Sequence, residues 1–164
     1  QIILANVHLV GGRYDENDNL GGMLKLELSE LRNVKNEILK KLVSQYQVDL
    51  IAGDFNSDLN CYLQEGVLSS SQLSFFQNVS PGKSLQTYQE WNLSPYNYLY
   101  SQDYQLSTNV SKDSVPVYTS IYKNHPDSIW FKKSLGKILS YNILDFLTPN
   151  LSDHNGLQIT LEIP

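Results

Sequence analysis

The sequence has little cysteine, no long hydrophobic run and no excess of basic residues. Cys61 is the only cysteine, so the chain forms no internal disulfide, which slightly favours a reducing, intracellular compartment. No apolar run approaches the roughly 18 residues that a transmembrane helix needs, so no membrane span is expected. With 12 basic and 17 acidic residues, the formal charge is −5. This charge argues against tight non-specific binding of nucleic acid but does not exclude a nuclease.

The chain also lacks an initiator methionine and a signal-peptide pattern. It begins at Gln1 and passes directly into the apolar run IILANVHLV, which is typical of a fragment. Its 164 residues, 41% hydrophobic and 18% charged, are enough for one globular domain with a real core. We therefore predict a single domain over residues 1–164 that lacks the N-terminal part of its fold.

Hydrophobic periodicity predicts an α/β arrangement in the first third of the chain. The apolar runs at residues 2–10 and 48–56 predict two buried strands. Between them, apolar residues recur every three or four positions over residues 23–46, which predicts an amphipathic helix with lysine and glutamate on its outer face. Strand, helix and strand in succession form a crossover unit, so a layered α/β fold is expected.

The remainder of the chain carries shorter patterns. Residues 59–77 predict one or two small helices, and residues 78–124, rich in Asn, Ser, Gln and Tyr, predict an irregular insertion. The segment DSIWF at 127–131 predicts a third strand, and residues 135–147 predict either a strand pair or a short helix. The alternating residues 157–163 predict a final strand.

Polar residues stand at the ends of the predicted strands. Asp54 and Asn56 would point to the same face if the strand continued through Phe55, whereas a turn is the alternative for the pairs Gly-Asp and Asn-Ser. The other polar residues are His8 in NVHL, Asp127 in PDSIW, and Asp153 and His154 in SDHNGL. Carboxylates for a hard cation, an Asp–His pair for proton transfer and neutral donors are together sufficient for metal-assisted attack of water on phosphate.

The order and spacing of NVHL, GDFN, PDSIWF and SDHNGL resemble the successive motifs of the exonuclease–endonuclease–phosphatase superfamily, which includes deoxyribonucleases, abasic-site endonucleases and sphingomyelinases. The resemblance leaves residues 78–124 unmatched. It implies the C-terminal part of a four-layer αββα sandwich with mixed and antiparallel sheets. It also implies a phosphodiesterase dependent on Mg²⁺, with Mn²⁺ as an alternative, that acts on nucleic acid or nucleotides.

The resemblance implies a role for each matched residue. Asp54 would orient or deprotonate the attacking water, and Asn56 would hold a phosphate oxygen. His154 would act as general acid–base or stabilise the transition state, and Asp127 would fix its tautomer.

Two more matched residues would bind the metal and the substrate. Asp153 would contribute to the Mg²⁺ site, and His8 would donate a hydrogen bond to the phosphate. Outside the matched motifs, Trp91 and the tyrosines of the insertion could stack on nucleic-acid bases or could simply pack the insertion onto the domain.

The superfamily's principal metal ligand, a glutamate in its N-terminal portion, has no counterpart here, because no residues precede Gln1. Half a sandwich would leave one sheet face open, to be covered by a missing N-terminal half or by a second chain. Two alternatives to a nuclease-like enzyme therefore stay open. One is a sphingomyelinase-like hydrolase of lipid or sugar phosphates, which a hydrophobic rim near residues 78–124 would favour. The other is a catalytically inactive interaction module.

Overall fold

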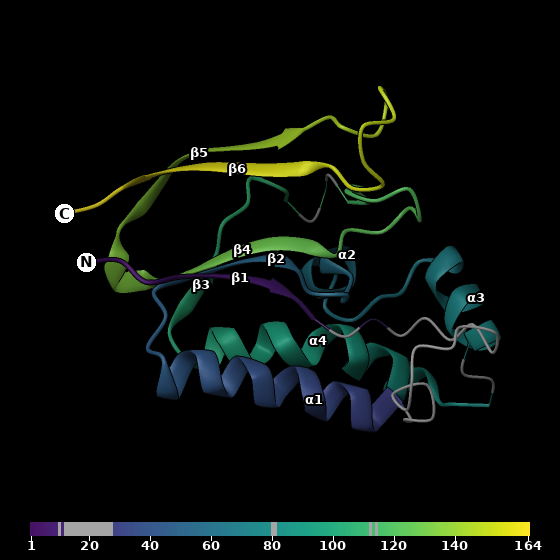
Figure 1. Ribbon diagram of the computed structural model, residues 1–164. Helices are drawn as coiled ribbons and strands as arrows, with labels where there is room; N and C mark the ends of the chain where they lie inside the picture. The colour runs from purple at the N-terminus through teal and green to yellow at the C-terminus, as the bar shows by residue number, and fades with distance from the viewer. Residues whose placement is uncertain (10, 12–27, 80–81, 112, 114) are drawn as a thin grey trace.

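Figure 1 shows the computed structural model, which describes residues 1–9, 11, 28–79, 82–111, 113 and 115–164. The described residues form three layers: a pair of long helices, a four-stranded sheet and a two-stranded hairpin. The protein is therefore an α/β protein, as the hydrophobic periodicity predicts.

The central layer is a mixed sheet with the strand order β1-β2-β4-β3. β1 and β2 are parallel and are joined through a helix, whereas the other neighbours are antiparallel. The register places His8 opposite Asp54 and Asp54 opposite Asp127, so three polar residues form one row at one end of the sheet. The strands are β1 (Leu4–His8), β2 (Leu50–Asp54), β4 (Asp127–Lys132) and β3 (Tyr104–Leu106).

Two helices, α1 (Leu28–Lys40) and α4 (Leu85–Ser101), cover one face of this sheet and lie side by side (Figure 1). Alternate strand residues point to this face, and Ile51 and Trp130 are fully buried there. The ring of Tyr96, from α4, stacks on Trp130 with the ring centroids 5.7 Å apart. The core therefore lies between the sheet and the two helices.

Short helical segments connect the layers. The short helix that begins at Leu59 is capped by Asp58, which accepts a hydrogen bond from the backbone N–H of Asn60. The long helix α4 is capped in the same way by Ser84, which accepts a hydrogen bond from the backbone N–H of Thr87. The short segments are the π-helical turn Lys41–Gln45 after α1, the helices α2 (Leu59–Leu63) and α3 (Ser70–Val79), and the 3₁₀ turn Lys133–Leu135.

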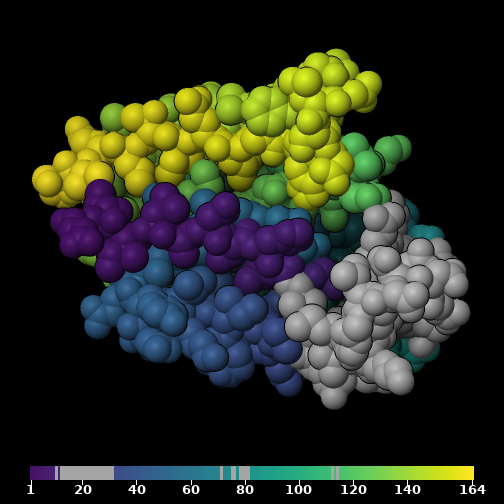
Figure 2. All heavy atoms as spheres, in the orientation of Figure 1, coloured from purple at the N-terminus to yellow at the C-terminus, as the bar shows by residue number. Residues whose placement is uncertain are grey.

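The third layer is an antiparallel hairpin of β5 (Lys137–Leu144) and β6 (Gly156–Glu162), which lies over the other face of the sheet (Figure 1). The outer face of the hairpin is polar, with Ser140 and Thr160 hydrogen-bonded across the strands at 2.9 Å. The hairpin leaves the edge strand β1 at the surface between α1 and β6 (Figure 2), and Leu4 is exposed there.

The prediction of an irregular insertion over residues 78–124 is wrong for residues 85–101 and 104–106. Residues 85–101 form the 17-residue helix α4, and residues 104–106 form β3. Pro95 and the many Asn, Ser and Tyr residues give this segment a low helix propensity. The helix forms because Ser84 caps it and because its buried face, which includes Trp91, Tyr96 and Leu99, packs in the core.

The other element predictions are largely confirmed. Two small helices, α2 and α3, lie within residues 59–79. Residues 135–147 contain a single strand, β5, instead of the predicted strand pair or short helix. The helix predicted over 23–46 is present from Leu28, while residues 23–27 lie outside the described residues. The described residues supply three layers, so the four-layer sandwich stays a prediction. Among these residues, no helix combines the length and the apolar character needed to cross a bilayer.

Candidate active site

Three of the predicted site residues meet at the end of the sheet where β2 finishes and β4 begins. Asp54 is the last residue of β2, Asp127 is the first residue of β4, and His154 lies just before β6. One potential ligand atom from each of these side chains lies within 4.8 Å of the other two. All three side chains are half-buried, with exposures of 18%, 14% and 25%, so they remain accessible from solvent.

The folding of two separate segments brings His154 to the sheet. An isolated bridge pairs Ser120 with His154, and the backbone N–H of Asn155 donates to the carbonyl of Thr119 at 2.7 Å. The hydroxyl of Thr119 in turn donates to Asp127 Oδ2 at 2.6 Å. Residues 119–120 therefore join the segment before β6 to the beginning of β4. The sequence patterns gave no sign of this role.

Asp127 and His154 form a hydrogen-bonded pair, with 2.9 Å between His154 Nδ1 and Asp127 Oδ2. An ionised carboxylate only accepts, so the proton of this bond belongs to Nδ1, and Nε2 is the atom left to face a substrate. Burial raises the pKa of Asp127, while the hydrogen bonds from Thr119 and His154 oppose that rise.

The pKa of His154 is raised above its ordinary value of 6.5. Burial lowers it, but the hydrogen bond with Asp127 and the negative charges of Asp127, Asp54 and Asp153 together outweigh the burial. The charged imidazole is therefore more favoured at this position than in a free histidine, which suits a group that donates a proton or binds an anion.

The carboxylate of Asp54 is oriented by the turn that follows it. Asp54 Oδ1 accepts a hydrogen bond from the backbone N–H of Asn56 at 2.6 Å, and Asp54 Oδ2 lies 3.7 Å from His8 Nε2. The backbone carbonyl of Asp54 is also bound, by the N–H of Leu9 at 2.8 Å. One carboxylate oxygen is thus used by the fold, and the other faces the site.

Asn56 does not continue the strand, so the prediction that it shares a face with Asp54 through strand geometry is wrong. Its φ of 47° lies in the left-handed region, which asparagine tolerates better than most residues. The side-chain Nδ2 donates to the carbonyl of Leu9 at 2.8 Å. This interaction occupies one of its two amide protons, and the turn alternative is the one that the structure adopts.

Gly53 allows β1 and β2 to approach closely just before Asp54. Its φ is 135°, and a Cβ atom at this position would lie 2.0 Å from the carbonyl oxygen of Val7. Only glycine fits this contact without displacing the backbone.

Lys35, on α1, is fully buried behind the turn and was not predicted as a site residue. Its ammonium donates to the carbonyl of Asn56 at 2.6 Å and to the hydroxyl of Ser57 at 2.8 Å, and it lies 3.6 Å from the centre of the Trp91 ring. Burial lowers its pKa well below 10.5, and the negative charge of Asp54 opposes that shift.

The structure excludes Trp91 as a stacking platform. Its side chain is only 2% exposed, one ring face is occupied by Lys35, and its Nε1–H donates to the carbonyl of Asn56 at 3.1 Å. Aromatic residues of an amphipathic helix are more often core than contact surface, and Trp91 supports the site from behind.

His8 and Asp153 are the two remaining predicted site residues, and both are exposed. His8 belongs to the polar row of the sheet, and its side chain is 81% exposed next to Asp54. Asp153 is exposed and lies outside the cluster of Asp54, Asp127 and His154, so the structure does not place it as a metal ligand together with them. It raises the pKa of His154 through its charge.

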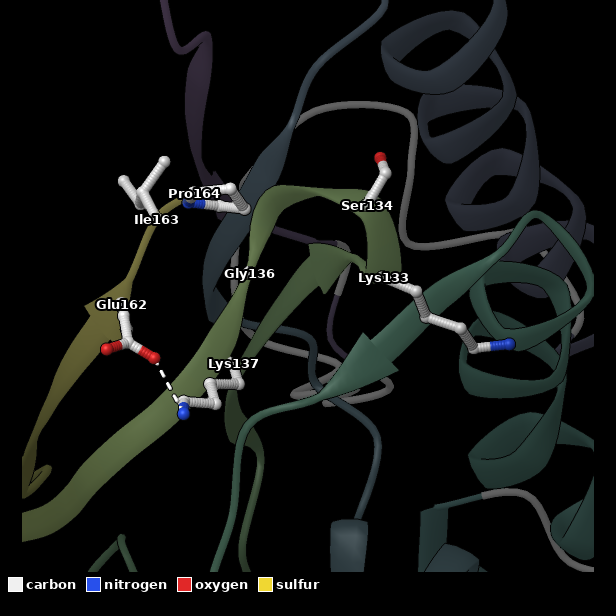
Figure 3. Close-up of a pocket in the computed structure, with 7 residues that line it drawn as sticks. All are labelled: Lys133, Ser134, Gly136, Lys137, Glu162, Ile163 and Pro164. Atoms are coloured by element: carbon white, nitrogen blue, oxygen red, sulfur yellow. Dashed lines mark ion pairs between the residues drawn. The ribbon is translucent and has the colours of Figure 1, made fainter.

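Of two hollows in the structure, one borders the candidate site and the other lies away from it. A cavity of about 200 Å³ between β2, β4 and β6 is bordered by Asp127. A larger surface hollow, about 510 Å³ and shown in Figure 3, lies at the opposite end of β4 and β6 between Lys133, Lys137 and Glu162. There, Lys137 and Glu162 bind each other at 2.7 Å, and Lys133 points away to Asp103 at 3.1 Å. The larger hollow therefore has no free cation for a phosphate among its described lining residues.

The carboxylate oxygens of Asp54 and Asp127 provide part of the oxygen ligands that Mg²⁺ needs. Mg²⁺ prefers oxygen ligands and is commonly bound through one or two carboxylates, with water and substrate phosphate completing its coordination. Asp54 offers an oxygen that no backbone group in the described residues occupies, whereas Asp127 Oδ2 is committed to Thr119 and His154. The free oxygen of Asp54 and the second oxygen of Asp127 are thus the atoms available to a cation or to a water proton.

Comparisons with models of known protein families, with curated proteins and with solved structures give no match to this chain.

Proposed function

We propose that this protein is a metal-dependent phosphodiesterase. The observation that carries the proposal is the hydrogen-bonded Asp127–His154 pair within 4.8 Å of the oriented carboxylate of Asp54. An imidazole whose partner holds it in one tautomer can transfer a proton, and a second carboxylate can activate water. The motifs GDFN, PDSIWF and SDHNGL support the same reading, since their resemblance to the exonuclease–endonuclease–phosphatase superfamily implies these roles.

In the proposed reaction, Asp54 Oδ2 accepts a proton from the water that attacks phosphorus. A new P–O bond forms while the bond to the leaving alkoxide breaks, and the alkoxide takes its proton from His154 Nε2. Asp127 keeps Nδ1 protonated and stabilises the imidazolium before that transfer. The products are a phosphate monoester and an alcohol, and solvent returns the proton from Asp54 to His154.

His8 and Asn56 would bind the substrate. His8 is exposed beside Asp54, where its imidazole can donate to a phosphate oxygen. Asn56 Nδ2 retains one proton after binding the carbonyl of Leu9. When Mg²⁺, or alternatively Mn²⁺, is bound through the second oxygen of Asp127, it would neutralise charge on the phosphate, while Asp54 Oδ2 stays free to accept the proton.

The superfamily also implies a four-layer sandwich, of which the helix, sheet and hairpin layers described here would be three. In that arrangement the remaining layer, from further residues of the same chain or from a second chain, would lie beside β1 and β6 (Figure 2). Leu4 in β1 and Ile163 just after β6 are exposed. The remaining layer would supply the glutamate that the superfamily uses as its principal metal ligand.

A nucleic acid or a nucleotide is the proposed substrate, and one observation favours a second class. Ile121, Tyr122 and Leu151 are exposed, and the backbone N–H of Ile121 donates to the carbonyl of Asp153 at 3.0 Å, next to His154. An apolar rim of this kind beside a phosphate site suits a sphingomyelinase-like hydrolase of lipid or sugar phosphates. A catalytically inactive interaction module is the third alternative, if the metal site stays incomplete.

The proposal is tested with bis(p-nitrophenyl) phosphate and Mg²⁺ or Mn²⁺. Asp54→Asn and His154→Ala should each lower kcat by about 10²- to 10⁴-fold, the range for loss of a general acid or base. Asp103→Asn is the matched control, because Asp103 is an exposed carboxylate paired with Lys133 at the other end of the sheet. Unchanged turnover in both site variants would contradict the mechanism. No turnover in the unmodified protein with either cation would favour the interaction module.

A further inference from the structure

The buried ammonium of Lys35 makes its contacts almost entirely with the turn after Asp54. Its side chain leaves α1, is 0% exposed, and ends 2.6 Å from the carbonyl oxygen of Asn56 and 2.8 Å from the hydroxyl of Ser57. A buried lysine is costly unless its charge is compensated by hydrogen bonds. In the described residues no carboxylate forms an ion pair with it, so its compensation comes from this turn and from the ring of Trp91.

Trp91 completes the arrangement around the same carbonyl. The Nε1–H of Trp91 donates to the oxygen of Asn56 at 3.1 Å, so this oxygen accepts from both Lys35 and Trp91. The hydroxyl of Ser57 accepts from Lys35 and donates to the backbone carbonyl of Trp91 at 3.1 Å. The ring of Trp91 lies under the ammonium at 3.6 Å, within cation–π distance. Three protons of an ammonium thus have three partners: two oxygens and one ring face.

These contacts hold a left-handed backbone conformation at Asn56, which asparagine tolerates better than most residues but adopts less readily than glycine. A left-handed conformation at a residue other than glycine is unfavourable and persists where the surroundings hold it. At φ 47°, the backbone N–H of Asn56 is directed at Asp54 Oδ1, at 2.6 Å. The orientation of the Asp54 carboxylate therefore depends on the backbone at Asn56, and that backbone is held from behind by Lys35.

We propose that Lys35 is a positioning residue for Asp54: it fixes the Asn56 carbonyl, and through it the N–H that orients the carboxylate. The inference rests on the proposed function, because Asp54 is the group that would activate water. Lys35 itself does not touch the substrate, since it is fully buried on the helix side of the turn.

A purely structural role for Lys35 makes a different prediction. Replacing a buried charge by an apolar side chain of similar size often leaves stability unchanged or improves it. If Lys35 only filled space, Lys35→Met would then be as active as the unmodified protein. If Lys35 positions Asp54, a stable Lys35→Met variant loses turnover, because a small displacement of a catalytic group costs up to about 10²-fold.

The experiment compares Lys35→Met and Lys35→Gln with Leu39→Ala. Leu39 lies one turn further along α1, is equally buried and packs in the core. Lys35→Met should lower kcat on bis(p-nitrophenyl) phosphate by roughly 10- to 100-fold with KM changed less than about two-fold. Lys35→Gln keeps amide donors for the two oxygens without the charge, so it should lose less. Leu39→Ala should be less stable than Lys35→Met and should keep its kcat at a temperature where it is folded.

The second readout does not depend on activity. The amide proton of Asn56, hydrogen-bonded to a carboxylate, should resonate downfield in the NMR spectrum and should move upfield in Lys35→Met but not in Leu39→Ala. If the unmodified protein turns over no phosphodiester, the proposed function fails, and the amide shift still tests Lys35. If folded Lys35→Met keeps both the amide shift and kcat, the positioning role is wrong.

Discussion

The two sides of the candidate site are held in different ways. The Asp54 turn is supported from the core: Lys35 and Trp91 bind the carbonyl of Asn56, and the hydroxyl of Tyr96 donates to the carbonyl of Ser57. The His154 side is supported from the surface, by the bridge to Ser120, by the N–H of Asn155 and by Asp127.

Because the two sides are supported differently, substitutions on each side should affect stability and activity to different extents. Substitutions behind the Asp54 turn should act on the core and on the carboxylate together, whereas substitutions around His154 should act mainly on its imidazole, the proposed proton-transfer group. The site is thus completed when the hairpin lies on the sheet, because only then does His154 reach Asp127. The predictions below test this contrast, beginning with the largest expected effect.

Asp127→Asn should have the largest effect on activity with a small effect on stability. The amide keeps a similar shape but removes the charge that raises the pKa of His154 and fixes its tautomer. We expect kcat to fall by about 10²- to 10⁴-fold.

The negative charge of Asp127 also makes the protonated form of His154 stabilise the folded state. This contribution is present below pH 6.5 and is lost as the pH rises through the raised pKa of His154. In Asp127→Asn that loss with rising pH should become smaller in the free energy of unfolding, measured by urea titration, because Asp54 and Asp153 still act on His154. An unchanged profile would mean that the pair contributes nothing.

The buried side chain of His125 should make the folded state less stable at acid pH. Its side chain is fully buried, neither ring nitrogen has a hydrogen-bond partner in the described residues, and burial lowers its pKa to about 4. The folded state therefore binds fewer protons than the unfolded state between about pH 4 and pH 6.5, and stability falls as the pH decreases through that interval. A shift of this size corresponds to about 3 kcal/mol.

The effect of His125 is measured as the difference in unfolding free energy between the unmodified protein and His125→Phe. A difference is needed because Asp58 changes the stability with pH in the opposite direction. Burial raises the pKa of Asp58 to about 6, so Asp58 favours the folded state as the pH falls. The advantage of the unmodified protein over His125→Phe in unfolding free energy should decrease by about 3 kcal/mol from pH 7 to pH 4. A difference that does not vary with pH would show that His125 does not titrate in this way.

Asp153→Asn should have the smallest effect and bears on the metal site. Asp153 is exposed and outside the carboxylate–histidine cluster, so its loss should lower kcat less than about three-fold and should slightly reduce the pKa of His154. The resemblance to the nuclease superfamily implies instead that Asp153 contributes to the Mg²⁺ site. A rise of about ten-fold or more in the Mg²⁺ concentration needed for half-maximal activity would support that implication and contradict the structural placement.

The sequence predicts those parts of the fold in which burial has a regular period. The strands that became β1, β2, β4 and β6 carry branched or alternating apolar residues, and their polar ends correctly indicate Asp54, Asp127 and His154 as neighbours. Helix α4 was missed because tertiary burial of its aromatic face outweighs its low helix propensity.

The supporting residues could not be predicted by the same means. In α1 the period places lysine on the outer face, yet Lys35 is buried, since its partners come from a turn and a helix far away in the sequence. Trp91 and Thr119 likewise act through contacts that no local pattern records. Asn56 left strand geometry because three groups hold its backbone and side chain in the turn.

The close approach of β1 and β2 at Gly53 has a consequence for protein engineering. A library that randomises the residues around Asp54 would return only glycine at position 53, because even a methyl group would collide with the carbonyl of Val7. Position 55 faces the core and would accept other large apolar residues more readily, at a cost in packing. Gly53 would therefore stay fixed in such a library, and variation around the site would be confined to the residues near His8 and His154.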